Sequence, residues 1–199
     1  MSQSDQILEL ARVLHVLRAA DVRERGWSPQ LLIRLHQDGR LRRLSRGLYG
    51  LPDAEVSEHQ TLMEVCQRVP KAVICLLSAL QFHEIGTQLP HEVWVALPGS
   101  AHTPQLSYPP LHIARMGGAA YSKGIQAVTA HGAPIRVYSP AKTVTDCFKF
   151  RNKIGLDVAL EALKDAWHSR KVTMVELAYF AKINRVDGVM QPYLEAVTH

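Results

Sequence analysis

The chain has 199 residues, a mass of 22.2 kDa and 47% hydrophobic residues, which suits one large domain or two small ones. The formal net charge of +5 favours an acidic partner. The longest uncharged apolar run, residues 72–80, falls far short of the ~20 residues that a membrane span requires. The composition therefore excludes a membrane-spanning protein, and we expect a soluble cytoplasmic one.

The first forty residues carry signals for three helices. Residues 5–19 repeat apolar side chains at helical spacing, and a second, short helix is predicted over residues 22–25. Ser28 and Pro29 mark the start of a third helix, because a serine oxygen caps free backbone N–H groups and proline tolerates the first helical position. Gly39 marks its end.

The third predicted helix has two chemically different faces. At about 100° per residue, Leu31, Leu32 and Leu35 gather on one side, which predicts a buried stripe. The opposite side is built of residue types that read DNA bases, namely Gln30, Ile33, Arg34 and Gln37.

A basic β-hairpin is predicted directly after this helix. The stretch RLRRLSRGLYGLP combines a turn at residues 45–47 with apolar flanks. Leu41 and Leu44 are three residues apart and cannot both face inward on a regular strand, so a bulge or a late strand start is required. Three helices followed by a basic hairpin is the order of a winged helix-turn-helix.

This arrangement predicts how each residue type would meet DNA. In the major groove Arg34 suits guanine, Gln30 or Gln37 suits adenine, and Ile33 suits a thymine methyl group. The arginines of the hairpin suit phosphates. Two alternatives remain open: the arginines only solvate a small domain, or the winged helix binds protein. The candidate DNA-binding residues are Ser28, Gln30, Ile33, Arg34, Gln37, Arg40, Arg42, Arg43 and Arg46.

The rest of the chain predicts a second, larger domain. We place the winged helix-turn-helix domain at residues 1–53 and the second domain at 54–199, with the junction at residues 53–57. SEHQ at 57–60 resembles a capping box that opens a helix ending near Val69. A helix over residues 72–84 is expected next, then strands in a mainly antiparallel sheet at residues 92–98, 111–115, 125–129 and 135–139.

Helices are predicted to close the chain. Ser139 and Pro140 start one that runs to about Phe150, residues 156–167 form the next, and a T-x-x-E capping box at Thr173 opens a third. Pro192 is expected to kink or separate the last turns. The expected fold class is α+β: an N-terminal winged helix-turn-helix domain, then a larger mixed α/β domain with a mainly antiparallel sheet and C-terminal helices.

The sequence favours no enzyme, metal or cofactor. It lacks G-x-S-x-G, P-loop, G-x-G-x-x-G and HExxH patterns. The nearest metal-like cluster pairs His83-Glu84 with His91-Glu92, which we interpret as exposed loop histidines. The three cysteines have no CxxC spacing and sit in apolar surroundings, so we expect buried thiols at Cys66, Cys75 and Cys147.

Two groups of charged residues on and after the helix that starts at Ser139 allow either a functional or a structural interpretation. Asp146 lies at helical spacing from Lys142 and Lys149, and such pairs are usually solvated salt bridges instead of catalytic groups. The basic run over residues 149–153 lies near a helix C-terminus, where cations complement the helix dipole. It also suits a second DNA-facing patch, and we favour the helix-dipole interpretation.

Four stretches carry a family resemblance. They are GRLRRLSRGLYGLPD at 39–53, VICLLSALQFHEI at 73–85, EVWVALP at 92–98 and GAPIRVYSPAKTVTDCFKFRNKIGLDVALEALKDA at 132–166. In this order the chain resembles the AbiEi family, the antitoxin and transcriptional repressor component of bacterial type IV toxin-antitoxin pairs. Residues 99–124 match only loosely, and no short motif for toxin neutralisation is visible.

The resemblance implies partners and site residues. The N-terminal domain would bind inverted repeats in double-stranded DNA of its own promoter. The C-terminal domain would counter a nucleotidyltransferase toxin encoded alongside, without necessarily forming a stable complex with it. By position, Gln30 and Arg34 of the third helix, and Arg42, Arg43 and Arg46 of the hairpin, correspond to the DNA-contacting elements of the family.

The sequence therefore favours a DNA-binding repressor that acts by occupying its promoter, with no cofactor. A first rival is an antitoxin or regulator that acts mainly by binding a toxin protein. A second rival is an enzyme that modifies nucleic acids, which would show magnesium-dependent activity on its own.

Overall fold

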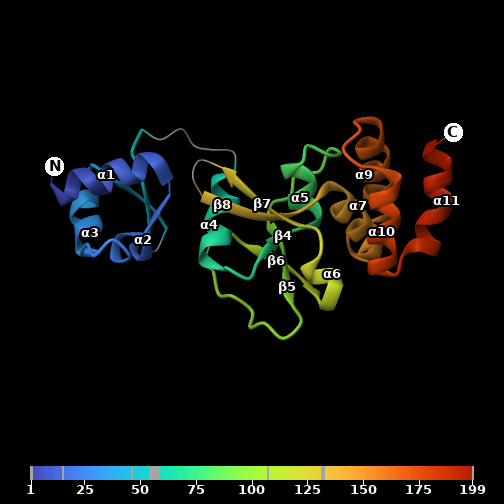
Figure 1. Cartoon of the computed structure of the whole chain (residues 1–199), viewed down its shortest axis with the longest axis horizontal. Helices are drawn as coiled ribbons and strands as arrows, with labels where there is room; N and C mark the ends of the chain where they lie inside the picture. The colour runs from blue at the N-terminus through green and yellow to red at the C-terminus, as the bar shows by residue number, and fades with distance from the viewer. Residues whose placement is uncertain are drawn as a thin grey trace. The chain divides into compact units, whose positions relative to one another are not determined.

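A computed structural model describes residues 2–14, 16–45, 47–53, 59–106, 108–130 and 133–198 (Figure 1). The chain divides into two compact units, Met1–Arg68 with Thr129–Pro134, and Val69–Val128 with Ile135–His199. Most of the predicted junction and the first half of the predicted SEHQ capping box lie outside the described residues. Within the described part of the chain, no helix is both long and apolar enough to cross a membrane.

The first unit begins with three helices in the predicted order, with two corrections to their bounds. The second helix runs over Ala19–Arg23 instead of residues 22–25. Helix α1 ends at Leu14, five residues earlier than predicted, because Leu17 and Arg18 pair with the hairpin as an extra strand. The elements are α1 (Gln3–Leu14), β1 (Leu17–Arg18), α2 (Ala19–Arg23), α3 (Gln30–Gln37), β2 (Arg42–Ser45), β3 (Leu48–Gly50) and α4 (Gln60–Arg68). Buried apolar side chains of α1, β1, α2, α3 and β3, together with Leu41 just before β2, form the core.

The hairpin forms an antiparallel sheet of order β1-β3-β2. Arg43 pairs with Tyr49 and Ser45 with Leu48, so Leu44 is an extra residue on β2. This shift is the predicted bulge, and β2 also starts late, since the buried Leu41 precedes it. Both features let leucines three residues apart avoid the wrong face of the sheet.

The second unit is built on a five-stranded sheet of order β6-β5-β4-β8-β7. The expectation of a mainly antiparallel sheet is wrong, since β5 runs parallel to β6 and β4 parallel to β8, while β4 and β5 are antiparallel. Residues 99–110 between β5 and β6 are long enough for the crossover that a parallel pair needs. The strands are β4 (Val73–Ile74), β5 (Val93–Pro98), β6 (Leu111–Met116), β7 (Ile125–Ala130) and β8 (Ala133–Tyr138).

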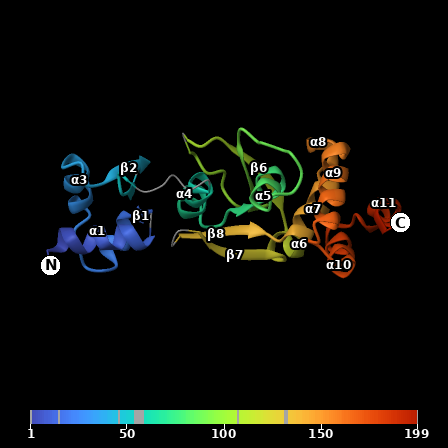
Figure 2. The same cartoon turned by 90° about the horizontal axis from the view of Figure 1, so that it is seen from above.

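The helices of the second unit follow the predicted starts. Ser139 Oγ accepts the Lys142 N–H (3.4 Å), and Thr173 Oγ1 accepts the Glu176 N–H (3.3 Å). In both views α7 lies beside α9 and α10, and it packs against both (Figure 2). The helices are α5 (Leu76–Phe82), α6 (Gly118–Ser122), α7 (Pro140–Lys149), α8 (Arg151–Ile154), α9 (Leu156–His168), α10 (Met174–Asn184) and α11 (Asp187–Thr198).

Two further expectations need correction. The helix predicted over residues 72–84 is shorter, because Val73 and Ile74 form β4 and the helix begins at Leu76. The last helix is not separated at Pro192, which lies inside α11. The cysteines are free and buried, as predicted.

Candidate nucleic-acid interface

Helix α3 is held by contacts at both ends. Pro29 occupies the cap position, and Ser28 just before it accepts two hydrogen bonds from the first turn: the Gln30 N–H donates to Ser28 Oγ (3.3 Å) and the Leu31 N–H to Ser28 O (3.1 Å). After the helix, Gly39 adopts a φ of +71°, a left-handed conformation that favours glycine. The chain then turns directly into β2, so helix and hairpin are fixed to each other within one small unit.

The two predicted faces of α3 are present. Leu32 and Leu35 are 1% and 2% exposed and belong to the core of the unit, whereas the side chain of Ile33 is 51% exposed. Ile33 therefore lies outside this core. Its neighbours on the exposed face of the helix are polar, and its side chain is open to a partner. The other residues predicted on the outer face, Gln30, Arg34 and Gln37, are also exposed.

The arginines after α3 are also on the surface. Arg42 and Arg43 are exposed on β2. Arg40 is exposed in the connecting turn, where its Nη2 lies 3.3 Å from Asp5 Oδ1. Hydrogen bonds from Ser2, and a smaller contribution from Arg40, lower the pKa of Asp5. The candidate residues that the structure describes are therefore all exposed on the first unit, while Arg46 lies outside the described residues; the exposed ones are Ser28, Gln30, Ile33, Arg34, Gln37, Arg40, Arg42 and Arg43.

Sequence reasoning missed His36, which joins the helix to the hairpin. Its Nδ1 lies 3.0 Å from the backbone oxygen of Leu41, and its ring makes an edge contact with the ring of Tyr49, with centroids 6.2 Å apart. Its place on α3, at the border between the buried and exposed faces, was the available signal.

A partly buried ion pair supports the same unit. Arg18 Nε donates to Asp21 Oδ1 (2.9 Å), and the Arg18 N–H donates to Asp21 Oδ2 (2.7 Å), which closes a capping box at the start of α2. Asp21 raises the pKa of Arg18. The pair links β1 to α2. The two charges therefore satisfy each other within the unit.

The histidine cluster noted in the sequence does not assemble into a metal site. His83 is half-buried and its Nε2 lies 2.6 Å from Tyr138 O, so the expectation of an exposed loop histidine is wrong for this residue. Burial lowers the pKa of His83. Within the described residues, no group of three or more metal-ligating side chains converges.

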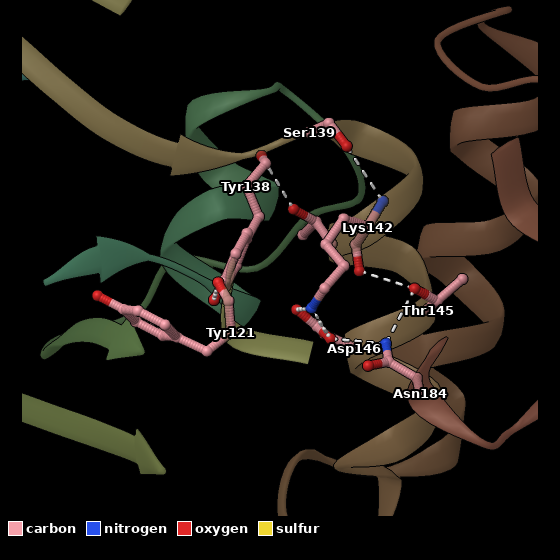
Figure 3. A network of polar contacts seen from close by, with 8 residues as sticks. Tyr121, Tyr138, Ser139, Lys142, Thr145, Asp146 and Asn184 are labelled. Carbon is pink, nitrogen blue, oxygen red and sulfur yellow. Dashed lines mark hydrogen bonds and ion pairs between the residues drawn. The ribbon is translucent and has the colours of Figure 1, made fainter. Parts of the chain in front are cut away.

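The charged residues of α7 differ from the solvated pair predicted for them. Lys142 and Asp146 are both 0% exposed, and Lys142 Nζ lies 2.5 Å and 2.6 Å from the two carboxylate oxygens of Asp146 (Figure 3). Asn184 Nδ2 donates to Asp146 Oδ1 (2.7 Å) and Thr145 Oγ1 (3.1 Å). Lys142 Nζ also lies 4.2 Å from the ring centroid of Tyr138.

This buried cluster is structural. Burial raises the pKa of Asp146, while Lys142 and Asn184 act in the opposite direction. No atom of the ion pair reaches solvent, so neither charge can bind a substrate or phosphate. The sequence could not reveal this, because the i, i+4 spacing of a buried pair equals that of a solvated one.

The basic run after α7 agrees in part with the favoured interpretation. Arg151 Nη1 donates to Phe148 O (2.9 Å) at the C-terminal end of α7, the position where a cation complements the helix dipole. Lys153 is exposed, with its Nζ 5.8 Å from the ring centroid of Phe150. Arg151, the first residue of α8, therefore acts on the C-terminal end of the preceding helix, α7.

Comparison with known proteins places the interface in a family context. Residues 5–52 match the sequence model of a family described as "Transcriptional regulator, AbiEi antitoxin", which confirms the resemblance over α1 to β3. A crystal structure of the RV2827C protein from Mycobacterium tuberculosis resembles the fold, with a TM-score of 0.60 and 17% identity, over 90% of this chain and 71% of that one. At this identity the likeness shows the fold alone. Among curated protein sequences, none matches significantly.

Proposed function

We propose that the protein is a cytoplasmic transcriptional repressor that binds inverted repeats in its own promoter and acts as the antitoxin of a type IV toxin-antitoxin pair. The observation that carries the proposal is the exposed outer face of α3 beside the cationic β2, inside the region that matches the antitoxin regulator family. Repression requires only that the protein occupies its promoter, with no chemical step.

The element order of the first unit supports a winged helix-turn-helix. In the order α1, β1, α2, α3, β2, β3, we assign α3 to the major groove and the β2–β3 hairpin to the wing. Arg34 is assigned to guanine and Gln30 or Gln37 to adenine, because these side chains match the hydrogen-bonding edges of those bases. Residues 1–53 are proposed as the DNA-binding domain and 54–199 as the antitoxin domain.

Phosphates would bind the arginines that follow α3. A guanidinium presents several N–H donors that fit two phosphate oxygens at once, and it keeps its charge at any physiological pH. Arg40, Arg42, Arg43 and Arg46 are assigned this role. The Asp5 contact of Arg40 is an exposed pair, so its exchange for a phosphate would cost little.

A promoter fusion tests the proposal in cells. The DNA upstream of the gene is joined to a reporter, and the protein is supplied from a second plasmid. Repression by the unaltered chain, lost in Arg34→Ala with the protein still folded, is the expected result. Unchanged reporter expression with abundant folded protein would contradict it. Growth rescue in cells that also produce the adjacent nucleotidyltransferase tests the antitoxin part separately.

A further inference from the structure

We propose that His36 is a phosphate-binding residue that couples DNA binding to the uptake of one proton. The inference rests on the proposed function and adds a residue and a pH dependence to it. His36 lies between the outer face of α3 and the hairpin, where helix and wing would both meet the DNA backbone.

The hydrogen bond to Leu41 fixes which ring nitrogen carries the proton. A backbone oxygen only accepts, so at 3.0 Å His36 Nδ1 must be the donor. In the neutral ring Nε2 is then an acceptor and cannot donate to a phosphate. Protonation places an N–H and a positive charge at Nε2 without breaking the bond to Leu41.

The position of the ring supports a phosphate contact. His36 is exposed, and its Nε2 makes no hydrogen bond with any described residue. Its ring makes an edge contact with Tyr49, a core residue that pairs with Arg43 in the sheet. Arg43 on the hairpin and His36 on the helix are both exposed.

The charge of a bound phosphate sets the direction of the effect. A phosphate favours the protonated imidazole, so binding should take up a proton. The affinity should rise as the pH falls. The titratable and charged groups on the segments around His36 are Asp5, Glu9 and Arg12 of α1, Arg34 and Asp38 at α3, Arg40 of the turn, Arg42 and Arg43 of β2, and Tyr49 of β3.

The test compares two substitutions that separate position from charge. In His36→Asn the side-chain amide can still donate to Leu41 O but does not titrate, whereas His36→Ala loses both properties. His102→Asn, at an exposed histidine of the second unit, is the matched control. Binding of the full chain to a labelled duplex from upstream of its gene is measured by anisotropy at about pH 6 and about pH 8, at constant ionic strength.

We expect the unaltered chain and His102→Asn to bind about three- to tenfold more tightly at the lower pH, and His36→Asn to show no such gain. The slope of log affinity against log salt should be steeper by about 0.9 at the lower pH, and only when His36 is present. Melting temperatures at the two pH values should differ equally in the unaltered chain and His36→Asn, because the Leu41 bond survives protonation.

Two results would overturn the inference. If binding is tight but its pH dependence is absent, or persists in His36→Asn, then His36 is not the coupled group, and the proposed DNA binding stands. If neither this duplex nor a scrambled one binds at any pH, the proposed function fails together with the inference.

Discussion

The surface of α3 and β2 and the interior of α7 use the same kinds of side chain for opposite purposes. In the first unit, arginines and polar residues are exposed around a small apolar core. In the second, Lys142 and Asp146 are enclosed completely and bind each other. A solvated charge keeps its hydration and stays available to a partner, while a buried charge must be satisfied where it lies. Position, more than residue type, thus separates charges that are open to a partner from charges that are satisfied within the fold.

The sharpest way to break this comparison is to remove one buried charge. Asp146→Ala leaves the Lys142 ammonium enclosed without its carboxylate, and we expect it to lower the free energy of unfolding by about 3–5 kcal/mol. Denaturant unfolding measures the change. The exposed Lys164→Ala serves as the control and should stay within roughly 0.5 kcal/mol of the unaltered chain.

The double variant Lys142→Met/Asp146→Leu refines the test. Replacing both charges removes the desolvation cost of each, so its stability should lie much closer to the unaltered chain than that of Asp146→Ala. Equal losses in the single and double variants would show that packing around α7, and not the charge, determines the stability.

A glycine next to the same cluster should give the next largest effect. Gly124 has a φ of +78°, and a Cβ built there would lie 2.8 Å from the Cβ of Lys142. Gly124→Ala should therefore cost roughly 2–4 kcal/mol, from the strained backbone and the overpacking together. Gly117→Ala is the control, because a Cβ there meets nothing within 4 Å and its φ is −136°. Thermal unfolding of the two variants measures the difference. Equal melting temperatures for both would contradict the tight packing of Gly124 against Lys142.

On the exposed side, loss of a charge should change binding and leave stability almost unaltered. Arg34→Ala should lower the preference for the promoter over scrambled DNA by about 1–3 kcal/mol. Arg42→Ala should weaken both DNAs alike and reduce the salt slope by about one. Competition binding at two salt concentrations separates the two roles. A similar loss of discrimination in both variants would contradict the division between base and phosphate contacts.

The smallest effect is expected from the pH dependence at His83. Its pKa is lowered by burial, so the unfolded chain binds a proton more readily than the folded one. The stability contribution of His83 is therefore present above the ordinary histidine range and is lost as the pH falls through it. His83→Gln can keep the hydrogen bond to Tyr138 O without titrating. The acid-side fall in melting temperature should be shallower in this variant, and an identical fall would rule out His83 as its source.

How much the sequence could predict depended on whether the signal was local. The Ser28 and Ser139 helix starts, the capping box at Thr173 and the bulge before Ser45 follow from neighbouring residues, and all were predicted. The parallel pairing of β5 with β6, and of β4 with β8, depends on contacts between distant segments, which periodicity does not record. For the same reason the short strand at Leu17 was read as part of a helix.

In the candidate site, too, features set by neighbouring residues were predicted, and features that depend on distant contacts were missed. The exposed face of α3 follows from helical spacing, so its residues were predicted correctly as a surface. His36 was missed because its importance comes from Leu41 and Tyr49, which meet it only after the hairpin folds. The burial of Lys142 and Asp146 was missed because it requires α10 to lie on α7.

The most direct test of the central claim is binding of the full chain to a labelled fragment from just upstream of its own gene. Scrambled DNA is the competitor, and the salt concentration is about 50 mM and then about 200 mM. We predict binding that survives the competitor and weakens with a log-log salt slope of about −4 to −5 per bound domain. Binding that the scrambled DNA competes away fully, or no binding at either salt concentration, would contradict the account and favour the toxin-binding rival.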